Sequence, residues 1–370
     1  MKTNPLKQLE TLGQSIWLDY IKRDLISSGK LKKLIDEDGL RGMTSNPSLF
    51  ENAIAKSSDY DADIQKMLQE GKDVNMIYAA LTQKDVQDAA DEFCHLYNQM
   101  NGRDGYVSLE VNPHLAHDTN GTIEEARRLW TQLNRPNVFI KVPATKEGLP
   151  AITQLISEGI NVNVTLLFGL SRYREVAEAY LAGIESRLSQ GKSIAHVSSV
   201  ASFFLSRIDV LLDPIFEKIM ADNTEKSELA KQLHGQIAIA SAKIAYSLYD
   251  EIFNSAKFKK LAEEGAQVQR LLWASTGTKN PEYSDIKYVE ALIGPETVNT
   301  LPLETIDAYR DHGDPKLRLG LDLDKATSFF QHLPDLGINM DQVTQQLENE
   351  GVDKFNKAYD QLIETLRKKK

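Results

Sequence analysis

The run VFIKVPAT at residues 138–145 contains the pattern that decides the fold. Its first five residues are mostly strand formers, Pro143 ends the strand, and a turn is expected after it. The same order of events recurs along the chain, because short strand-like runs alternate with longer stretches of helical periodicity. The predicted strands lie at 15–19, 42–45, 106–111, 138–142, 160–165, 195–200, 270–275 and 297–301.

Two of the helical stretches show a clear amphipathic period. Apolar residues recur three or four positions apart through 172–188 and 225–253, which is typical of helices that bury one face. Strands that alternate with helices predict a parallel sheet with right-handed crossovers. Eight such units predict an α/β fold of the closed (β/α)8 type, the TIM barrel. An open doubly wound sheet is the structural alternative.

The chain of 370 residues is longer than a barrel requires. A (β/α)8 barrel takes about 250 residues, so we expect helical insertions at 51–103 and 202–265. We interpret 1–370 as a single barrel domain in which 320–370 form a C-terminal helical extension.

Composition narrows the class of protein. The net charge of −10 argues against binding to nucleic acid or to an anionic membrane. The N-terminus lacks the apolar core of a signal peptide and no run is long enough to span a membrane, so a cytoplasmic protein, either a monomer or a homodimer, is expected. The single cysteine, Cys94, cannot form a disulfide within the chain, and we predict it to be a small core residue on a helix.

The predicted barrel directs attention to the carboxyl ends of its strands, where barrel active sites lie. A ring of polar residues at this rim is what a sugar-binding barrel would show, although strand ends are often polar simply because loops follow. That simpler explanation accounts poorly for Glu110 and Lys141, since both have apolar neighbours. The polar residues at the strand ends include Asp19, Thr44, Asn46, Glu110, Lys141, Asn163, Thr165 and Ser275.

Lys141 admits three interpretations. Its stem could rest on apolar neighbours with the ammonium in water, or it could form a structural ion pair with Glu110 or Asp19. As a third possibility, a partly desolvated amine has a lowered pKa and can attack a ketone to form a Schiff base. The third interpretation needs proton carriers, and Glu110 on the adjacent strand and Asp19 on the same rim are the candidates.

Five motifs together resemble those of the transaldolase family, in the family's order and across most of the chain. They are TSNPSLF (44–50), SLEV (108–111), VFIKVPAT (138–145), GINVNVTLLF (159–168) and LLWASTGTKNP (271–281). The length and the STGTKNP form are similar to the longer bacterial branch. The resemblance implies a class I aldolase barrel that acts on phosphorylated sugars, without a cofactor or a metal ion. The implied reaction transfers a dihydroxyacetone unit from sedoheptulose 7-phosphate to glyceraldehyde 3-phosphate, giving erythrose 4-phosphate and fructose 6-phosphate.

The resemblance also implies roles for single residues. Lys141 matches the Schiff-base lysine, Glu110 the carboxylate that works through a catalytic water, and Thr165 the hydroxyl that holds this water. Asp19 matches the acid and base at the cleaved bond, although IWLDYIKRD departs from the small-residue context of some branches. The residues matched to binding of the dihydroxyacetone unit are Asn46 and Asn163, and Thr44 is expected in the same site.

A phosphate site is implied by the segment SVASFFLSRID. Ser202, Phe204 and Arg207 match the family's spacing of serine, aromatic residue and arginine, and Ser275 matches a further phosphate contact. Lys279 stands near the position where the family commonly has another arginine. The alternative for Arg207 is an ion pair with Asp209, two residues further on, which is a poor spacing for a helical pair.

Other classes of protein were weighed against this one. A metal-dependent aldolase could use Glu110, His114 and His117, but Pro113 interrupts this stretch and surface histidines explain it better. The GKS at 191–193 lacks the upstream glycine of a phosphate loop. A non-catalytic sugar-phosphate binder would not need the amine. Simple cleavage of fructose 6-phosphate shares the lysine, but such relatives usually lack a carboxylate at the position of Glu110.

Overall fold

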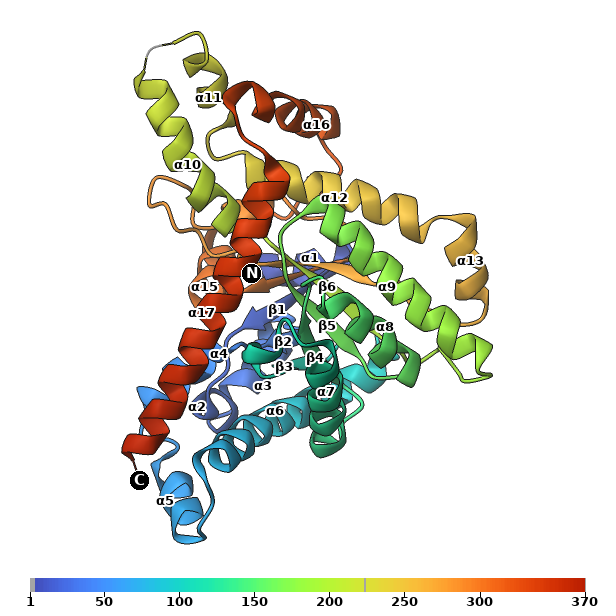
Figure 1. Cartoon of the computed structure of the whole chain (residues 1–370), viewed down its shortest axis with the longest axis vertical. Helices are drawn as coiled ribbons and strands as arrows, with labels where there is room; N and C mark the ends of the chain where they lie inside the picture. Colours follow the sequence, from blue (N-terminus) through green and yellow to red (C-terminus); the bar gives the residue numbers. More distant parts are fainter. Residues whose placement is uncertain (1–3, 223, 370) are drawn as a thin grey trace.

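The computed structural model describes residues 4–222 and 224–369, and a closed barrel of eight parallel strands lies at its centre (Figure 1). The strands pair in chain order, and β8 pairs back with β1, so the sheet has no open edge. This order confirms the (β/α)8 barrel and rules out the open doubly wound sheet. The strands are β1 (Gln14–Asp19), β2 (Gly42–Thr44), β3 (Tyr106–Glu110), β4 (Val138–Pro143), β5 (Val162–Leu167), β6 (Ser199–Phe204), β7 (Arg270–Ala274) and β8 (Thr297–Leu301).

Helices surround the barrel and cover the outer face of its strands, which is why the strand residues are almost all buried, on whichever face they lie. The α-helices are α1 (Pro5–Thr11), α2 (Arg23–Ser27), α3 (Lys30–Asp38), α4 (Pro47–Ala55), α5 (Asp61–Gln69), α6 (Val74–Gln99), α7 (Thr119–Leu133), α8 (Gly148–Glu158), α9 (Leu170–Ser189), α10 (Ser206–Ala221), α11 (Ser227–Leu233), α12 (Ile237–Phe253), α13 (Ala256–Glu263), α14 (Lys287–Glu290), α15 (Leu303–His312), α16 (Leu323–His332) and α17 (Met340–Lys368), and the 3-10 helices are η1 (Pro113–Leu115) and η2 (Leu333–Leu336).

Strand β6 lies four residues further along the chain than predicted. The apolar and small residues continue past the predicted 195–200, and hydrophobicity alone does not locate the start of such a run. Pairing with β5 and β7 fixes the strand at Ser199–Phe204. As a result Ser199 begins the strand, and Ser202 and Phe204 lie towards its carboxyl end.

Two helical predictions also need correction. The continuous helix expected at 225–253 is divided into α11 and α12, because Gly235 adopts a left-handed φ of 68° between them. Cys94 is exposed rather than in the core. Its neighbour Phe93 faces inward on α6, and Cys94 lies one step around the helix from that buried face.

The predicted helical extension is present and ends in the long helix α17. Figure 1 shows α17, in red, running along the molecule past α4 and α15 towards α5. It packs against α4, α6, α10, η1 and β5. Its buried face includes Leu347, Gly351, Phe355 and Leu362, which recur at helical spacing. The prediction of a single domain over 1–370 remains a prediction, and 1–3 and 370 lie outside the described residues.

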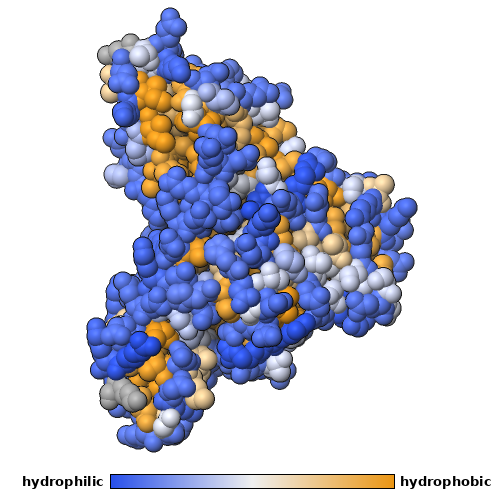
Figure 2. Space-filling view, viewed as in Figure 1, coloured by the Kyte–Doolittle hydropathy of each residue, from blue (hydrophilic) through white to orange (hydrophobic). Residues whose placement is uncertain are grey.

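The surface in Figure 2 is mostly hydrophilic, and apolar side chains gather over the region of α10 and α11. Val210 and Ile215 of α10 are 52% and 40% exposed. Within residues 4–222 and 224–369, no helix is long and apolar enough to cross a membrane.

Candidate active site

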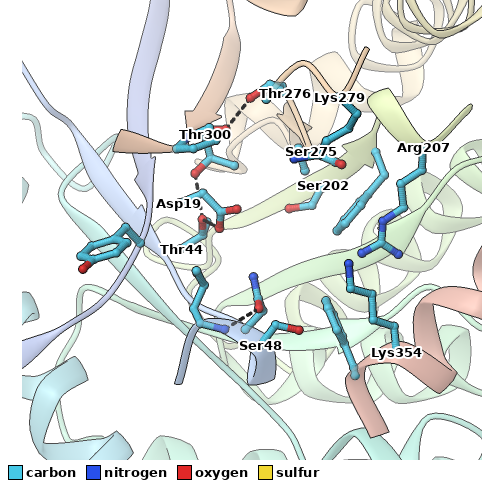
Figure 3. Close-up of a pocket in the computed structure, with 18 of the residues that line it drawn as sticks. Asp19, Thr44, Ser48, Ser202, Arg207, Ser275, Thr276, Lys279, Thr300 and Lys354 are labelled. Atoms are coloured by element: carbon cyan, nitrogen blue, oxygen red, sulfur yellow. Dashed lines mark hydrogen bonds between the residues drawn. The ribbon is translucent and has the colours of Figure 1, made fainter. Parts of the chain in front are cut away.

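A cavity of about 770 Å³ opens at the carboxyl ends of the barrel strands (Figure 3). Its wall combines the ends of strands with residues from α4, α10 and α17. Most of the residues predicted for the site line this cavity: Asp19, Thr44, Asn46, Lys141, Ser202, Phe204, Arg207, Ser275 and Lys279. The other three, Glu110, Asn163 and Thr165, are buried beside it and are not part of its wall.

Lys141 is buried in β4 and only 4% exposed. Its Nζ donates a hydrogen bond to the backbone oxygen of Ser45 at 2.8 Å. The same atom lies 3.6 Å from Oε2 of Glu110, the residue opposite it on β3. Lys141 therefore does not extend its ammonium into bulk water, and the interpretation as a surface lysine is wrong.

Glu110 is the charged partner of Lys141, but the contact is loose. Neither of its carboxylate oxygens has a hydrogen-bond partner among the described residues, and 3.6 Å is too long for a good hydrogen bond. Burial raises the pKa of Glu110 to about 7, against the opposing effect of the Lys141 charge. Glu110 also lines a separate cavity of about 280 Å³ together with Tyr78 and Thr82. A carboxyl group with this pKa can take up and release a proton near neutral pH.

Asp19 lies at the end of β1 and is held by a chain of hydroxyl groups. Thr44 Oγ1 donates to Asp19 Oδ1 at 2.8 Å, and the same hydroxyl lies 2.8 Å from Thr300 Oγ1. Because the proton of Thr44 is used by Asp19, Thr300 is the donor in the second contact. Burial raises the pKa of Asp19, and the charge of Lys141 opposes this rise.

The two predicted amides have different surroundings. Asn46 is the N-cap of α4: its backbone is extended and its side-chain oxygen accepts a hydrogen bond from Leu49 N at 3.1 Å. Asn163 donates to Ser108 Oγ at 3.1 Å and accepts from Ser202 Oγ at 2.6 Å. Asn46 reaches the cavity directly, whereas Asn163 contacts the cavity wall through Ser202.

Thr165 is fully buried in β5, in register with Pro143, two positions after Lys141. Its hydroxyl has no hydrogen-bond partner within the described part of the chain. A buried hydroxyl without a partner is costly, so Thr165 and Glu110 present unsatisfied polar oxygens on β5 and β3, the two strands that flank β4.

Cationic side chains gather at the end of the cavity away from Asp19, where Figure 3 shows Arg207, Lys279 and Lys354. The Arg207 guanidinium lies 5.6 Å from the centre of the Phe204 ring, and burial lowers its pKa. Asp209 contacts Lys287 at 3.1 Å and Tyr288 at 2.7 Å instead. The alternative of an Arg207–Asp209 pair is therefore wrong.

Ser275 marks a strained turn at the same end. Its φ of 55° is in the left-handed region, which is uncommon for a residue with a side chain. Its Oγ lies 2.9 Å from Ser206 Oγ. Such strain is often found where a backbone must face a ligand.

Sequence reasoning placed Ser45 and Thr300 at strand ends but assigned no role in the site to them or to Lys354. Thr300 was recognisable as a polar residue at the end of the eighth strand. Ser45 acts through its backbone oxygen, which no side-chain pattern predicts. Lys354 belongs to α17, and only packing in three dimensions brings this helix to the cavity.

The residues of the alternative metal site are not brought together. His114 contacts Asp360 at 2.8 Å, and His117 contacts Glu147 at 3.1 Å. Among the described residues there is no group of three or more His, Cys, Asp or Glu side chains arranged to hold a metal ion. The GKS at 191–193 follows α9 and precedes β6, which places it at the amino end of the barrel, opposite the cavity.

Comparisons with known proteins agree with the geometry. A family model described as "Transaldolase/Fructose-6-phosphate aldolase" matches residues 16–366, which include both the barrel and nearly all of α17. The chain is 50% identical to a protein named "Transaldolase" from Trichodesmium erythraeum, over 100% of this chain and 98% of the relative. It is 45% identical to a protein of the same name from Saccharopolyspora erythraea, over 99% of this chain and 98% of the relative. It is 46% identical to a protein named "Transaldolase" from Thiobacillus denitrificans, over 97% of this chain and 99% of the relative.

Proposed function

Because the chain belongs to the transaldolase/fructose-6-phosphate aldolase family, we propose that it transfers a dihydroxyacetone unit reversibly from sedoheptulose 7-phosphate to glyceraldehyde 3-phosphate. The products are erythrose 4-phosphate and fructose 6-phosphate, as in the non-oxidative pentose phosphate pathway. The observation that carries this proposal is a buried lysine, Lys141, that opens onto the cavity and has the carboxylate of Glu110 3.6 Å from its amine.

The first half of the reaction forms and uses a covalent adduct. The free amine of Lys141 attacks the ketone carbon, and the carbinolamine loses water to give the protonated Schiff base. Glu110 carries the protons that this dehydration requires, through a water molecule held by Thr165; its pKa of about 7 and its unpartnered oxygens support this role.

Carbon–carbon cleavage follows from the Schiff base. Asp19 removes the proton from the hydroxyl at the bond to be broken, the bond electrons move into the iminium, and an aldehyde leaves. The remaining enamine stays attached to Lys141. It then attacks the second aldehyde, Asp19 returns the proton, and hydrolysis releases the new ketose. The raised pKa of Asp19 suits both uptake and return of a proton.

Substrate contacts divide between the two ends of the cavity. Asn46 and Thr44 hold hydroxyls of the dihydroxyacetone unit near Lys141. Asn163 was matched to the same hydroxyls, but it is buried beside the cavity and accepts a hydrogen bond from Ser202, which lines it. At the far end Arg207 offers a planar fork to the phosphate, with Ser202, Ser275, Lys279 and the Phe204 ring in the same cavity wall. The cytoplasm as the location, and a monomer or homodimer as the assembly, remain predictions.

Borohydride trapping with fructose 6-phosphate tests the proposal. Mass spectrometry should find the reduced adduct on the peptide that contains Lys141, and Lys141→Ala should abolish both the adduct and turnover. Lys192→Ala serves as a control, because this exposed lysine lies at the opposite end of the barrel. An adduct on another lysine, or labelling retained in Lys141→Ala, would refute the assignment.

Simple cleavage of fructose 6-phosphate is the second candidate, because the description of the matching family names both activities. Glu110 beside Lys141 favours transfer. Incubation of fructose 6-phosphate with and without erythrose 4-phosphate separates the two. A transaldolase turns over only when the acceptor aldehyde is present, whereas an aldolase releases dihydroxyacetone without it.

A further inference from the structure

Lys354 of α17 is a cation in the wall of the active-site cavity. It also borders a neighbouring cavity of about 620 Å³ between α4 and α17. Within residues 4–222 and 224–369, its ammonium makes no hydrogen bond or ion pair, unlike Lys22 and Lys287, which pair with aspartates. Lys354 is exposed at the wall of the cavity, so its ammonium is free to contact an anionic ligand that enters there.

Lys354 and Arg207 lie at the same end of the cavity. In Figure 3 the two side chains, from α17 and α10, point into the same end of the cavity, with Lys279 above them. Gly351 lies one turn before Lys354, and a Cβ added there would come within 3.4 Å of Arg207 Nη1 and 2.9 Å of Leu166 Cδ2. α17 thus lies directly against the guanidinium, and a residue without a side chain makes this approach possible.

The charges at this end of the cavity are unbalanced. Partial burial lowers the pKa of Lys354, and the positive charges of Arg207 and Lys279 lower it further. Glu350 of α17 lines the same cavity, and its charge favours the charged form of Arg207. Yet among the described residues Glu350 forms no ion pair with any of the three cations, and it accepts a hydrogen bond from Gln346 at 2.7 Å. Three converging cations repel one another until an anion lies between them.

We propose that Lys354 binds the phosphate group of the sugar substrate together with Arg207 and Lys279, so that α17 completes the substrate site. A phosphate monoester carries up to two negative charges and several acceptor oxygens, which suit one guanidinium fork and two flexible ammonium groups. The phosphate would lie at the end of the cavity away from Asp19, with the sugar extending to Lys141. This assignment rests on the proposed function, since it takes the substrate to be a sugar phosphate.

Lys357 provides a matched control for Lys354. It lies on the same helix and is also exposed, but it borders only the cavity between α4 and α17. Lys354→Met and Lys357→Met remove the same charge from α17 and keep a similar length of side chain. Lys354→Arg keeps the charge and tests rescue.

The kinetic experiment compares fructose 6-phosphate with unphosphorylated fructose as donors. Lys354→Met should raise KM for fructose 6-phosphate by about tenfold or more, as expected for a lost hydrogen bond between charged groups, with a much smaller change in kcat. The loss of kcat/KM should be far larger for the phosphorylated donor than for fructose. Lys354→Arg should recover most of the loss, and Lys357→Met should behave as the unmodified protein. Equal losses on the two donors, or equal effects in the two Met variants, would overturn the assignment.

Binding of inorganic phosphate separates this inference from the proposed function, because it requires no turnover. Titration calorimetry should show about tenfold weaker phosphate binding to Lys354→Met than to Lys357→Met. Unchanged phosphate binding would refute the role of Lys354 even if Lys141 is labelled by borohydride. Conversely, weakened phosphate binding without labelling of Lys141 would support the anion site and refute the proposed function.

Discussion

The barrel contains two buried cation–carboxylate pairs, one at each end. Arg270 and Asp104 lie at the amino end and are 5% and 2% exposed. Lys141 and Glu110 lie at the carboxyl end and are 4% and 7% exposed. The two pairs have similar burial and the same combination of charges, but they differ in how their hydrogen-bonding capacity is used.

At the amino end the polar groups of the pair have many partners. Asp104 accepts hydrogen bonds from Arg270 at 2.9 Å, Ser15 at 2.8 Å and Trp17 at 3.2 Å. Arg270 also donates to Ser15 Oγ and to the backbone oxygen of Arg103. At the carboxyl end, Glu110 has no hydrogen bond from the described residues and lies 3.6 Å from the amine. A buried pair is costly unless its polar atoms are satisfied, so the first pair has the hydrogen bonds of a structural contact, and the unsatisfied second pair fits the catalytic role proposed for it.

The largest expected effect comes from breaking the pair at the amino end. Arg270→Met leaves the Asp104 carboxylate buried without its cation, which should cost about 3–5 kcal/mol of stability. Urea unfolding followed by circular dichroism measures this loss. The neighbouring Arg103→Met is the control, since its pair with Glu296 is exposed on both sides, and such pairs contribute about 0–1 kcal/mol. Equal midpoints for the two variants would show that the pair at the amino end is not structural.

A substitution in the pair at the carboxyl end should reduce turnover rather than stability. Glu110→Gln should slow turnover by about a hundredfold or more, with little loss of thermal stability, because the carboxylate has no hydrogen bonds to lose. Parallel measurement of kcat and melting temperature tests both parts. A large fall in melting temperature with nearly normal turnover would make Glu110 a structural partner like Asp104.

Removal of a single hydroxyl group near each pair should have smaller effects of the same two kinds. Thr165→Val removes an unpartnered hydroxyl at nearly constant shape, so stability should be kept while turnover falls by about tenfold. Ser15→Ala removes a hydroxyl that both donates to Asp104 and accepts from Arg270, so stability should fall by about 1–3 kcal/mol with turnover kept. The reverse assignment of losses would contradict the proposed division of roles.

The smallest expected effect is a dependence of stability on pH. The pKa of Glu110 is about 7 in the folded protein, above its ordinary value of 4.5, so the folded state binds the proton more tightly than the unfolded state. The stability contributed by the protonated carboxyl is present below pH 4.5 and is lost as the pH rises to 7. The melting temperature of the unmodified protein, relative to that of Glu110→Gln, should therefore fall by about 2–4 °C between pH 5 and pH 8. A difference that stays constant or rises would refute the raised pKa.

The barrel and much of the cavity were predictable from local sequence, for reasons that the residues show. Strand-forming runs such as 138–142 alternate with helices, and the polar side chains at their ends meet at one rim. The exact position of β6 was not predictable, because the apolar run around it is longer than the strand and its start depends on pairing with β5 and β7. Whether Glu110 faced Lys141 depended in the same way on the register of β3 and β4.

The positions of Lys354 and Cys94 could not be predicted from the residues next to them in the sequence. In the sequence Lys354 resembles any charged residue on an amphipathic helix. Only the packing of α17 against Arg207 places it in the wall of the cavity. Cys94 shows the converse, since a helical pattern alone did not reveal on which face of α6 it lies.

The position of α17 at the C-terminal end of the fold has a consequence for synthesis on the ribosome. All eight strands of the barrel precede α17 in the chain, so the ribosome synthesises them before it. A nascent chain therefore contains Lys141 and Glu110, which lie opposite each other on β4 and β3, before Leu347, Lys354 and Phe355 of the cavity wall have been added. The lysine proposed to react is thus synthesised early and part of the cavity wall late, so a chain interrupted before α17 carries the amine without the residues that α17 adds to the cavity.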